Sequence, residues 1–198
     1  MSFYEAKQKA KAIIKNNLGE SIVTYLLYSA ALTLANMIFG VGGLLFGSLI
    51  LMGFYACLID ASNTGRFKIE KLISEFKGEY FTTRILLSVI KNIYIFFWSL
   101  LFIIPGIVKS YSYMLSELIA MQRPDLSASE CISESRRLMS GHKMNMFILD
   151  LSFIGWHILC LLSFGLGYLV LYPYIYQTKI EYIDANILPI KNVVIDAK

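Results

Sequence analysis

Long apolar runs dominate this chain, and short segments rich in lysine and arginine separate them. Each run contains 16 to 20 residues. A helix that rises about 1.5 Å per residue needs roughly 20 residues to cross a hydrocarbon core of about 30 Å. We therefore predict about six membrane spans, at residues 22–39, 43–61, 85–104, 106–121, 146–162 and 164–180.

The composition excludes a water-soluble globular domain. Hydrophobic residues make up 57% of the 198 residues and charged residues 16%, against about 45 to 50% and about 25% in soluble domains. Membrane β-barrels use alternating strands of about 10 residues, which would not produce unbroken apolar runs. The sequence predicts an all-α fold, a polytopic transmembrane helical bundle that forms one domain over residues 1–198.

The six runs differ in how clearly they predict a span. The second and fifth are the clearest. The fourth is the weakest, because Lys109 and Glu117 lie inside it and Pro105 stands immediately before it. The first run follows a long basic stretch and has no small-x-small site at its end, so we predict a permanent span and not a cleaved signal peptide.

The basic residues predict how the helices are oriented. They gather before the first run, between the second and third, between the fourth and fifth, and in the tail after residue 180. The opposite connections, at residues 40–42, at Pro105 and near Ser163, are short and carry few charges. By the positive-inside rule both termini are cytoplasmic, and three tight hairpins point outward. The charge pattern thus predicts a multi-pass membrane protein.

The chain also contains a repeated pattern. A short amphipathic segment precedes each predicted hairpin, and each segment ends at a helix-stopping residue. A fixed period of this kind is typical of repeated structural units. The stops are about 62 to 63 residues apart, at Asn16 and Asn17, at Gly78 and at Gly141. We predict three units, at residues 1–63, 64–125 and 126–198, each an interfacial helix followed by a transmembrane hairpin.

Two of the amphipathic segments begin with a capping-box pattern, Ser2 with Glu5 and Ser127 with Glu130. An apolar stripe opposite basic residues is typical of helices that lie in the headgroup plane. Such helices either bind lipid or a partner through their basic face, or merely anchor the hairpins. The candidate lipid- or partner-binding residues are Arg136, Arg137, His142, Lys143, Lys7 and Lys11.

Polar side chains within the runs form a second set of candidates. Charged groups inside a bilayer are costly and are usually retained for a reason. We consider Lys91, Glu117, Asp150 and His157 as a candidate intramembrane polar cluster. The cluster is either a structural network of ion pairs between helices or part of a proton or substrate path.

The motifs of catalysis and metal binding are missing from the sequence. There is no HExxH, GxSxG or P-loop, and Cys57, Cys131 and Cys160 show no CxxC spacing. We therefore expect no catalytic residues, no cofactor, no metal site and no enzyme activity. A net charge of +4 is explained by membrane topology, so nucleic acid is not an expected partner.

Several segments of the second half resemble a known family. Residues 135–143 read SRRLMSGHK and residues 149–156 read LDLSFIGW, and further agreement occurs at residues 104–106, 165–167 and 172–174. These segments resemble the domain of unknown function 975 family, integral membrane proteins of Gram-positive bacteria. The resemblance implies a plasma-membrane protein and transfers no catalytic or transport residues.

Two kinds of function follow from these observations. The first is a non-enzymatic membrane protein that binds lipid or a membrane partner through basic interfacial helices on its cytoplasmic face. The alternative is a small transporter or transport accessory with a polar intramembrane path. Expected partners are membrane lipids, and a membrane protein or a second copy of the chain, since Gly43 and Gly47 form a GxxxG pair.

Overall fold

The computed structural model describes residues 1–39, 42–77 and 80–190, and within these ranges the chain is helical and contains no strand. The predicted helix stop at Gly78 and the basic residues of the tail lie outside the described residues. The helices are α1 (Phe3–Asn16), α2 (Leu18–Phe39), α3 (Gly42–Thr64), the 3-10 helix η1 (Ile69–Lys77), α4 (Phe81–Leu101), α5 (Ile103–Ser112), α6 (Ser116–Gln122), α7 (Ala128–Leu138), α8 (Lys143–Leu151), α9 (Ile154–Leu162) and α10 (Tyr168–Asn186).

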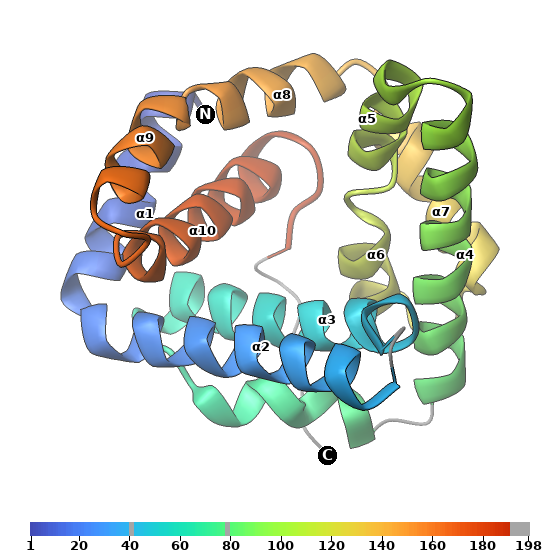
Figure 1. Cartoon of the computed structure of the whole chain (residues 1–198), viewed down its shortest axis with the longest axis horizontal. Coiled ribbons are helices and arrows are strands. Elements are labelled where there is room, and N and C mark those ends of the chain that lie inside the picture. Colours follow the sequence, from blue (N-terminus) through green and yellow to red (C-terminus); the bar gives the residue numbers. More distant parts are fainter. Residues whose placement is uncertain (40–41, 78–79, 191–198) are drawn as a thin grey trace.

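Two helices hold the fold together (Figure 1). Helix α3 packs against α2, η1, α4, α6 and α10, and α10 packs against α1, α2, α3 and α9. In the view of Figure 1, α1, α2, α4 and α8 run along the four sides of the molecule, and α10 lies inside them. The fully buried side chains Met52, Phe54 and Leu58 place the centre of the core on α3.

The ends of the amphipathic helices follow the predicted local chemistry. Ser2 caps α1 and Ser127 caps α7, and in each case the glutamate three residues later completes a capping box. These reciprocal bonds satisfy backbone N–H groups that the first turn of a helix leaves without partners. Gly141 follows α7 with φ of +83°, a left-handed conformation that glycine adopts without strain. The spacing of residues therefore predicted both helix starts correctly.

Four helical segments are long and apolar enough to cross a membrane. They correspond to the first, second, third and fifth predicted runs. The fourth run falls on α5 and α6, and the sixth falls within α10, which carries Lys179 and Glu181 near its end. Six spans are thus not confirmed by length and hydropathy. The four segments are Leu18–Ile38, Gly42–Thr64, Phe81–Leu100 and Lys143–Leu162.

A serine from another helix stabilises the break in the fourth run. The backbone N–H of Leu115 donates to Ser135 Oγ at 3.1 Å, and Ser135 Oγ donates to the Ser112 carbonyl at 2.9 Å. Ser135 lies on α7 and is fully buried. Its hydroxyl replaces bonds that a continuous helix would make, so the chain turns between α5 and α6 without losing those hydrogen bonds.

Each pair of helices that follows an amphipathic segment is closely packed at a glycine. A Cβ on Gly42 would overlap the Ala35 carbonyl, one on Gly106 would overlap Ser99, and one on Gly167 would press on Cys160. In all three cases the contact lies seven residues before the glycine. The glycines recur at intervals of 64 and 61 residues. Small residues of this kind allow two helix backbones to approach each other.

The tyrosines of the sixth run contribute to the interior. Tyr172 stacks on Tyr25 with ring centroids 5.3 Å apart, and Tyr176 meets the ring of Phe54 at 5.3 Å. Tyr28 also stacks on Phe54, at 4.6 Å. These rings join α2, α3 and α10. The aromatic residues near Pro173 therefore pack between helices, because α10 lies inside the fold.

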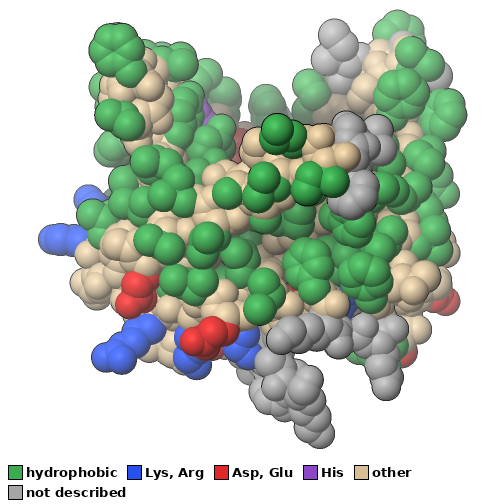
Figure 2. Space-filling view, turned by 60° about the horizontal axis from the view of Figure 1, so that its bottom comes forward, with side chains coloured by type: hydrophobic (Ala, Val, Ile, Leu, Met, Phe, Trp, Pro, Cys, Tyr) green, Lys and Arg blue, Asp and Glu red, His purple; other side chains and the backbone are tan. Residues whose placement is uncertain are grey.

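The outer surface is strongly apolar (Figure 2). Large hydrophobic side chains are exposed on α2, α4, α5, α8 and α9, and Phe164, between α9 and α10, is 99% exposed. On the face in Figure 2, hydrophobic side chains cover the upper part, and most charged side chains lie at the left and lower left, with acidic side chains also at the right edge. Soluble monomers rarely expose apolar patches larger than a few hundred Å². This surface is suited to lipid and not to water.

Candidate functional site

The predicted polar residues Lys91 and Glu117 form a buried ion pair. Lys91 comes from α4 and Glu117 from α6, and the glutamate side chain is 1% exposed. Glu117 Oε1 also accepts a hydrogen bond from Ser48 Oγ of α3 at 3.0 Å, and Oε2 accepts one from Ser116 Oγ at 3.2 Å. The pair thus joins three helices. Both carboxylate oxygens have partners, as a buried charge requires.

Asp150 belongs to a different contact. Its Oδ1 lies 2.8 Å from Lys179 Nζ, and its Oδ2 accepts a hydrogen bond from the hydroxyl of Tyr111 at 2.8 Å. These groups come from α8, α10 and α5 respectively. Lys179 and Tyr111 were not among the candidate site residues, although the basic position late in the sixth run was visible in the sequence. This contact ties α8 to two neighbouring helices.

His157 takes part in neither ion pair. Its ring lies 5.7 Å from the ring of Tyr168 and 6.3 Å from that of Tyr172. Among the described residues, the four polar candidates therefore separate into two ion pairs and a histidine that contacts two tyrosine rings. Periodicity alone could not show this, because it does not reveal which helix faces which.

The sequence analysis did not identify two further sets of polar contacts. Buried Gln177 donates to Ser62 Oγ at 2.6 Å, and Ser62 in turn donates to Glu181 at 2.6 Å, which links α10 to α3. Arg84 Nη2 lies 2.8 Å from Glu75 Oε2, and both side chains are almost fully buried. The polar positions of the sixth run and the charges before the third run were the signals that could have indicated them.

The apolar faces of α1 and α7 pack on the protein. On α1, Ala6, Ala10 and Ile14 are buried and the helix lies against α10. On α7, Cys131 and Ile132 are buried and the helix lies against α4 and α6. These stripes therefore do not insert into a headgroup layer. The basic faces of the two helices remain directed outward.

The candidate basic residues of α1 differ in their surroundings. Lys7 Nζ donates to the Ser152 carbonyl at 3.4 Å and lies 4.3 Å from the centre of the Phe153 ring. Partial burial lowers the pKa of Lys7. Ser152 and Phe153 form the break between α8 and α9, so Lys7 supports that turn. Lys11, one turn later, is exposed.

One glutamate, Glu134, forms ion pairs with two arginines of the basic segment around α7. Glu134 lies 2.7 Å from Arg137 Nε and 2.9 Å from Arg123 Nη2. Hydrogen bonds from these two arginines lower the pKa of Glu134 to about 2. Arg136 is exposed beside them, and His142 and Lys143 are half-buried where α8 begins. The candidates of this segment therefore share one end of α7 and the start of α8.

The three cysteines do not belong to a metal-binding arrangement in the described part of the chain. Cys57, Cys131 and Cys160 are buried free thiols. Over residues 1–39, 42–77 and 80–190, no three histidine, cysteine or carboxylate side chains are arranged to hold a metal ion. The polar groups described above can bind helices together and, on the basic surface, attract anions.

The helical fold, the apolar surface and the four long apolar helices define the class: this is an α-helical membrane protein. Residues 102–186 match the model of the family described as protein of unknown function (DUF975). The match covers the second half of the chain, from residue 102 to 186, and confirms the resemblance found in the sequence. No curated protein and no solved structure gave a significant match to the chain.

Proposed function

We propose that this protein is a non-enzymatic, multi-pass protein of the bacterial plasma membrane that binds anionic lipid through a basic cytoplasmic face. Both termini lie in the cytoplasm, and three helical hairpins point outward. The helices α5 with α6 and α10 complete the second and third hairpins, which gives six crossings. A membrane-protein partner of acidic character would use the same face.

The separation of charge from apolar surface supports this proposal. Exposed basic residues lie on α1 and around α7, whereas the connection after α9 exposes Phe164 and Leu166. On the face in Figure 2, Lys and Arg side chains lie at the left and lower left, and hydrophobic side chains cover the upper part. Positive charge on one side of a helical bundle is the pattern of cytoplasmic segments.

Charge, and not insertion, carries the proposed binding. The apolar stripes of α1 and α7 are covered by α10, α4 and α6, so they are not available to the hydrocarbon layer. Each basic residue near an anionic membrane surface contributes about 1 kcal/mol, and salt screens the attraction. We therefore expect the preference for anionic lipid to weaken as the salt concentration rises.

The transport alternative has less support. It requires Lys91, Glu117, Asp150 and His157 to line one path. Among the described residues, Lys91 pairs with Glu117, and Asp150 pairs with Lys179. These contacts satisfy the charges locally, which favours a structural role for them.

Two cysteine variants test the orientation. Phe164→Cys lies in the proposed outward connection, and Ser140→Cys lies in the exposed segment after α7. An impermeant maleimide added to intact cells is expected to label the first variant and to reach the second after the membrane is opened. The native protein, whose cysteines are buried, serves as the control. Labelling of Ser140→Cys in intact cells would contradict the proposal.

Binding is tested at Arg136, which is exposed. In native mass spectrometry, Arg136→Gln is expected to retain fewer molecules of phosphatidylglycerol than the native protein, with phosphatidylethanolamine unchanged. Arg136→Lys keeps the charge and should behave like the native protein. Equal retention by all three proteins would exclude this residue as part of a lipid-binding face.

A further inference from the structure

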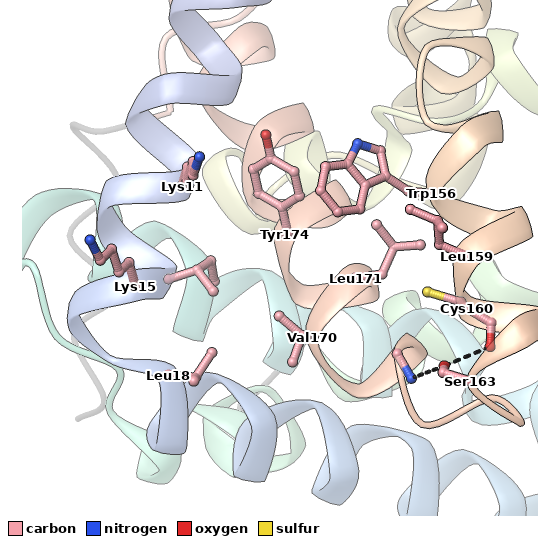
Figure 3. Close-up of a pocket in the computed structure, with 12 residues that line it drawn as sticks. Lys11, Lys15, Leu18, Trp156, Leu159, Cys160, Ser163, Val170, Leu171 and Tyr174 are labelled. Carbon is pink, nitrogen blue, oxygen red and sulfur yellow. Dashed lines mark hydrogen bonds between the residues drawn. The ribbon is translucent and has the colours of Figure 1, made fainter.

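An apolar groove of about 530 Å³ lies between α1, α9 and α10 (Figure 3). Trp156 and Leu159 line it from α9, and Val170 and Leu171 line it from α10. In Figure 3 these side chains face α1, which forms the opposite wall. The volume is within the range of about 300 to 1,000 Å³ that is usual for ligand sites.

The wall offers few hydrogen-bonding groups. Ser163, which lies at the groove, donates its hydroxyl to the Cys160 carbonyl at 2.8 Å and accepts the Gly167 N–H at 3.0 Å. Figure 3 marks both bonds. The hydroxyl is therefore already engaged. A peptide segment in this groove would bury backbone N–H and C=O groups without partners, which is costly, whereas a hydrocarbon chain would bury none.

Two lysines stand on the α1 side of this apolar wall. Lys11 and Lys15 line the groove from α1, and both are exposed. Within the described part of the chain neither lysine forms an ion pair. Tyr174 lies beside Lys11 in Figure 3, with its hydroxyl directed away from Leu171. The groove thus combines two available positive charges with a long apolar surface.

We propose that the groove binds an anionic glycerophospholipid of the inner leaflet, with an acyl chain along Trp156, Leu159, Val170 and Leu171 and the phosphate at Lys11 and Lys15. The inference rests on the proposed orientation, which places α1 at the cytoplasmic surface. Apolar walls bury the chain, and the ammonium groups select the headgroup by its charge. The site is distinct from the basic segment around α7.

The native tryptophans allow this site to be tested directly. Trp156 lines the groove, whereas Trp98 lies on α4 with its ring 4.2 Å from Lys109 Nζ. Trp98→Phe leaves Trp156 as the reporter of the groove, and Trp156→Phe leaves Trp98 as the reporter of lipid elsewhere. Each single-tryptophan protein is reconstituted with brominated phosphatidylglycerol or brominated phosphatidylcholine, and quenching gives the relative affinity of the two lipids.

At Trp156 we expect phosphatidylglycerol to be preferred by up to about 30-fold, which corresponds to about 1 kcal/mol for each of two lysines. The double variant Lys11→Gln with Lys15→Gln should bring the ratio close to one. Lys9→Gln removes an exposed charge of α1 that does not line the groove and should leave the ratio nearly unchanged. The ratio at Trp98 should be the same in all of these variants, because none of them alters its surroundings.

A variant that fills the groove gives an independent result. Val170 lines the groove and is 40% exposed, so Val170→Phe adds volume there without enlarging the core. It should reduce quenching of Trp156 by either brominated lipid and leave quenching of Trp98 unchanged. Thermal stability of the variant, followed by circular dichroism, confirms that the helices stay folded.

The remaining outcomes would overturn the proposal in different ways. Equal quenching of Trp156 by both lipids would show a groove that holds acyl chains without selecting a headgroup. No quenching by either lipid would show that protein, such as a second copy of the chain, covers the groove. If phosphatidylglycerol is still retained through Arg136 in these cases, the basic face binds lipid and the groove does not. Loss of both the lipid preference at Trp156 and the retention of phosphatidylglycerol through Arg136 would contradict the proposed function as well.

Discussion

The buried pair of Lys91 and Glu117 leads to the sharpest prediction about stability. Lys91→Met removes the ammonium group and keeps a side chain of similar length. The Glu117 carboxylate then remains at 1% exposure with hydroxyl donors from Ser48 and Ser116. Removing one partner of a buried ion pair costs about 3 to 5 kcal/mol, because the other charge is left without compensation.

We therefore expect Lys91→Met to lose about 3 to 5 kcal/mol of unfolding free energy, because Ser48 and Ser116 supply hydrogen bonds to the carboxylate but no compensating charge.

The assay is equilibrium unfolding in mixed detergent micelles with increasing dodecyl sulfate, followed by circular dichroism. The double variant Lys91→Met with Glu117→Gln carries no buried charge at this site and should be more stable than Lys91→Met alone. Arg137→Gln, which alters an exposed pair, should cost about 1 kcal/mol or less. A loss below about 1 kcal/mol for Lys91→Met, or a double variant no more stable than Lys91→Met alone, would refute this account of the pair.

Three further predictions concern packing, pH and capping. Gly42→Leu should abolish folded protein in gel filtration, because its Cβ would overlap the Ala35 carbonyl, whereas Gly155→Ala meets nothing within 4 Å and should be tolerated. Glu134 has a pKa lowered to about 2, so its contribution to stability is present above about pH 4.5 and is lost as the pH falls toward 2. The difference in thermal stability between the native protein and Glu134→Gln should accordingly shrink below pH 4.5, and a constant difference would contradict it. Ser127→Ala should cost about 1 kcal/mol in the detergent titration through loss of its capping bond, and no change would show that the α7 cap is not needed.

Local patterns predicted a large part of the fold. The starts of α1 and α7 follow from Ser2 and Ser127, because a capping box depends on residues within one turn. The long apolar helices and the membrane class follow from the length and hydropathy of continuous runs. The family match also lies in contiguous sequence. The threefold repeat remains a prediction, which the recurring glycine contacts at Gly42, Gly106 and Gly167 support.

Other features required the tertiary structure. The sequence shows that Glu117 and Asp150 are costly inside a membrane, but not that Lys91 compensates one and Lys179 the other. Likewise, the break after Ser112 depends on Ser135, which is supplied by α7.

The sequence by itself therefore determined the class of protein, its all-α character and the starts of α1 and α7. The tertiary structure decided which polar groups meet, where the stripes of α1 and α7 are buried, and that Lys11 lies beside an apolar groove lined by α9 and α10. The physical reason is the distance along the sequence over which each interaction acts. Hydropathy and capping act within one helix, whereas ion pairs and grooves depend on how helices distant in sequence pack together.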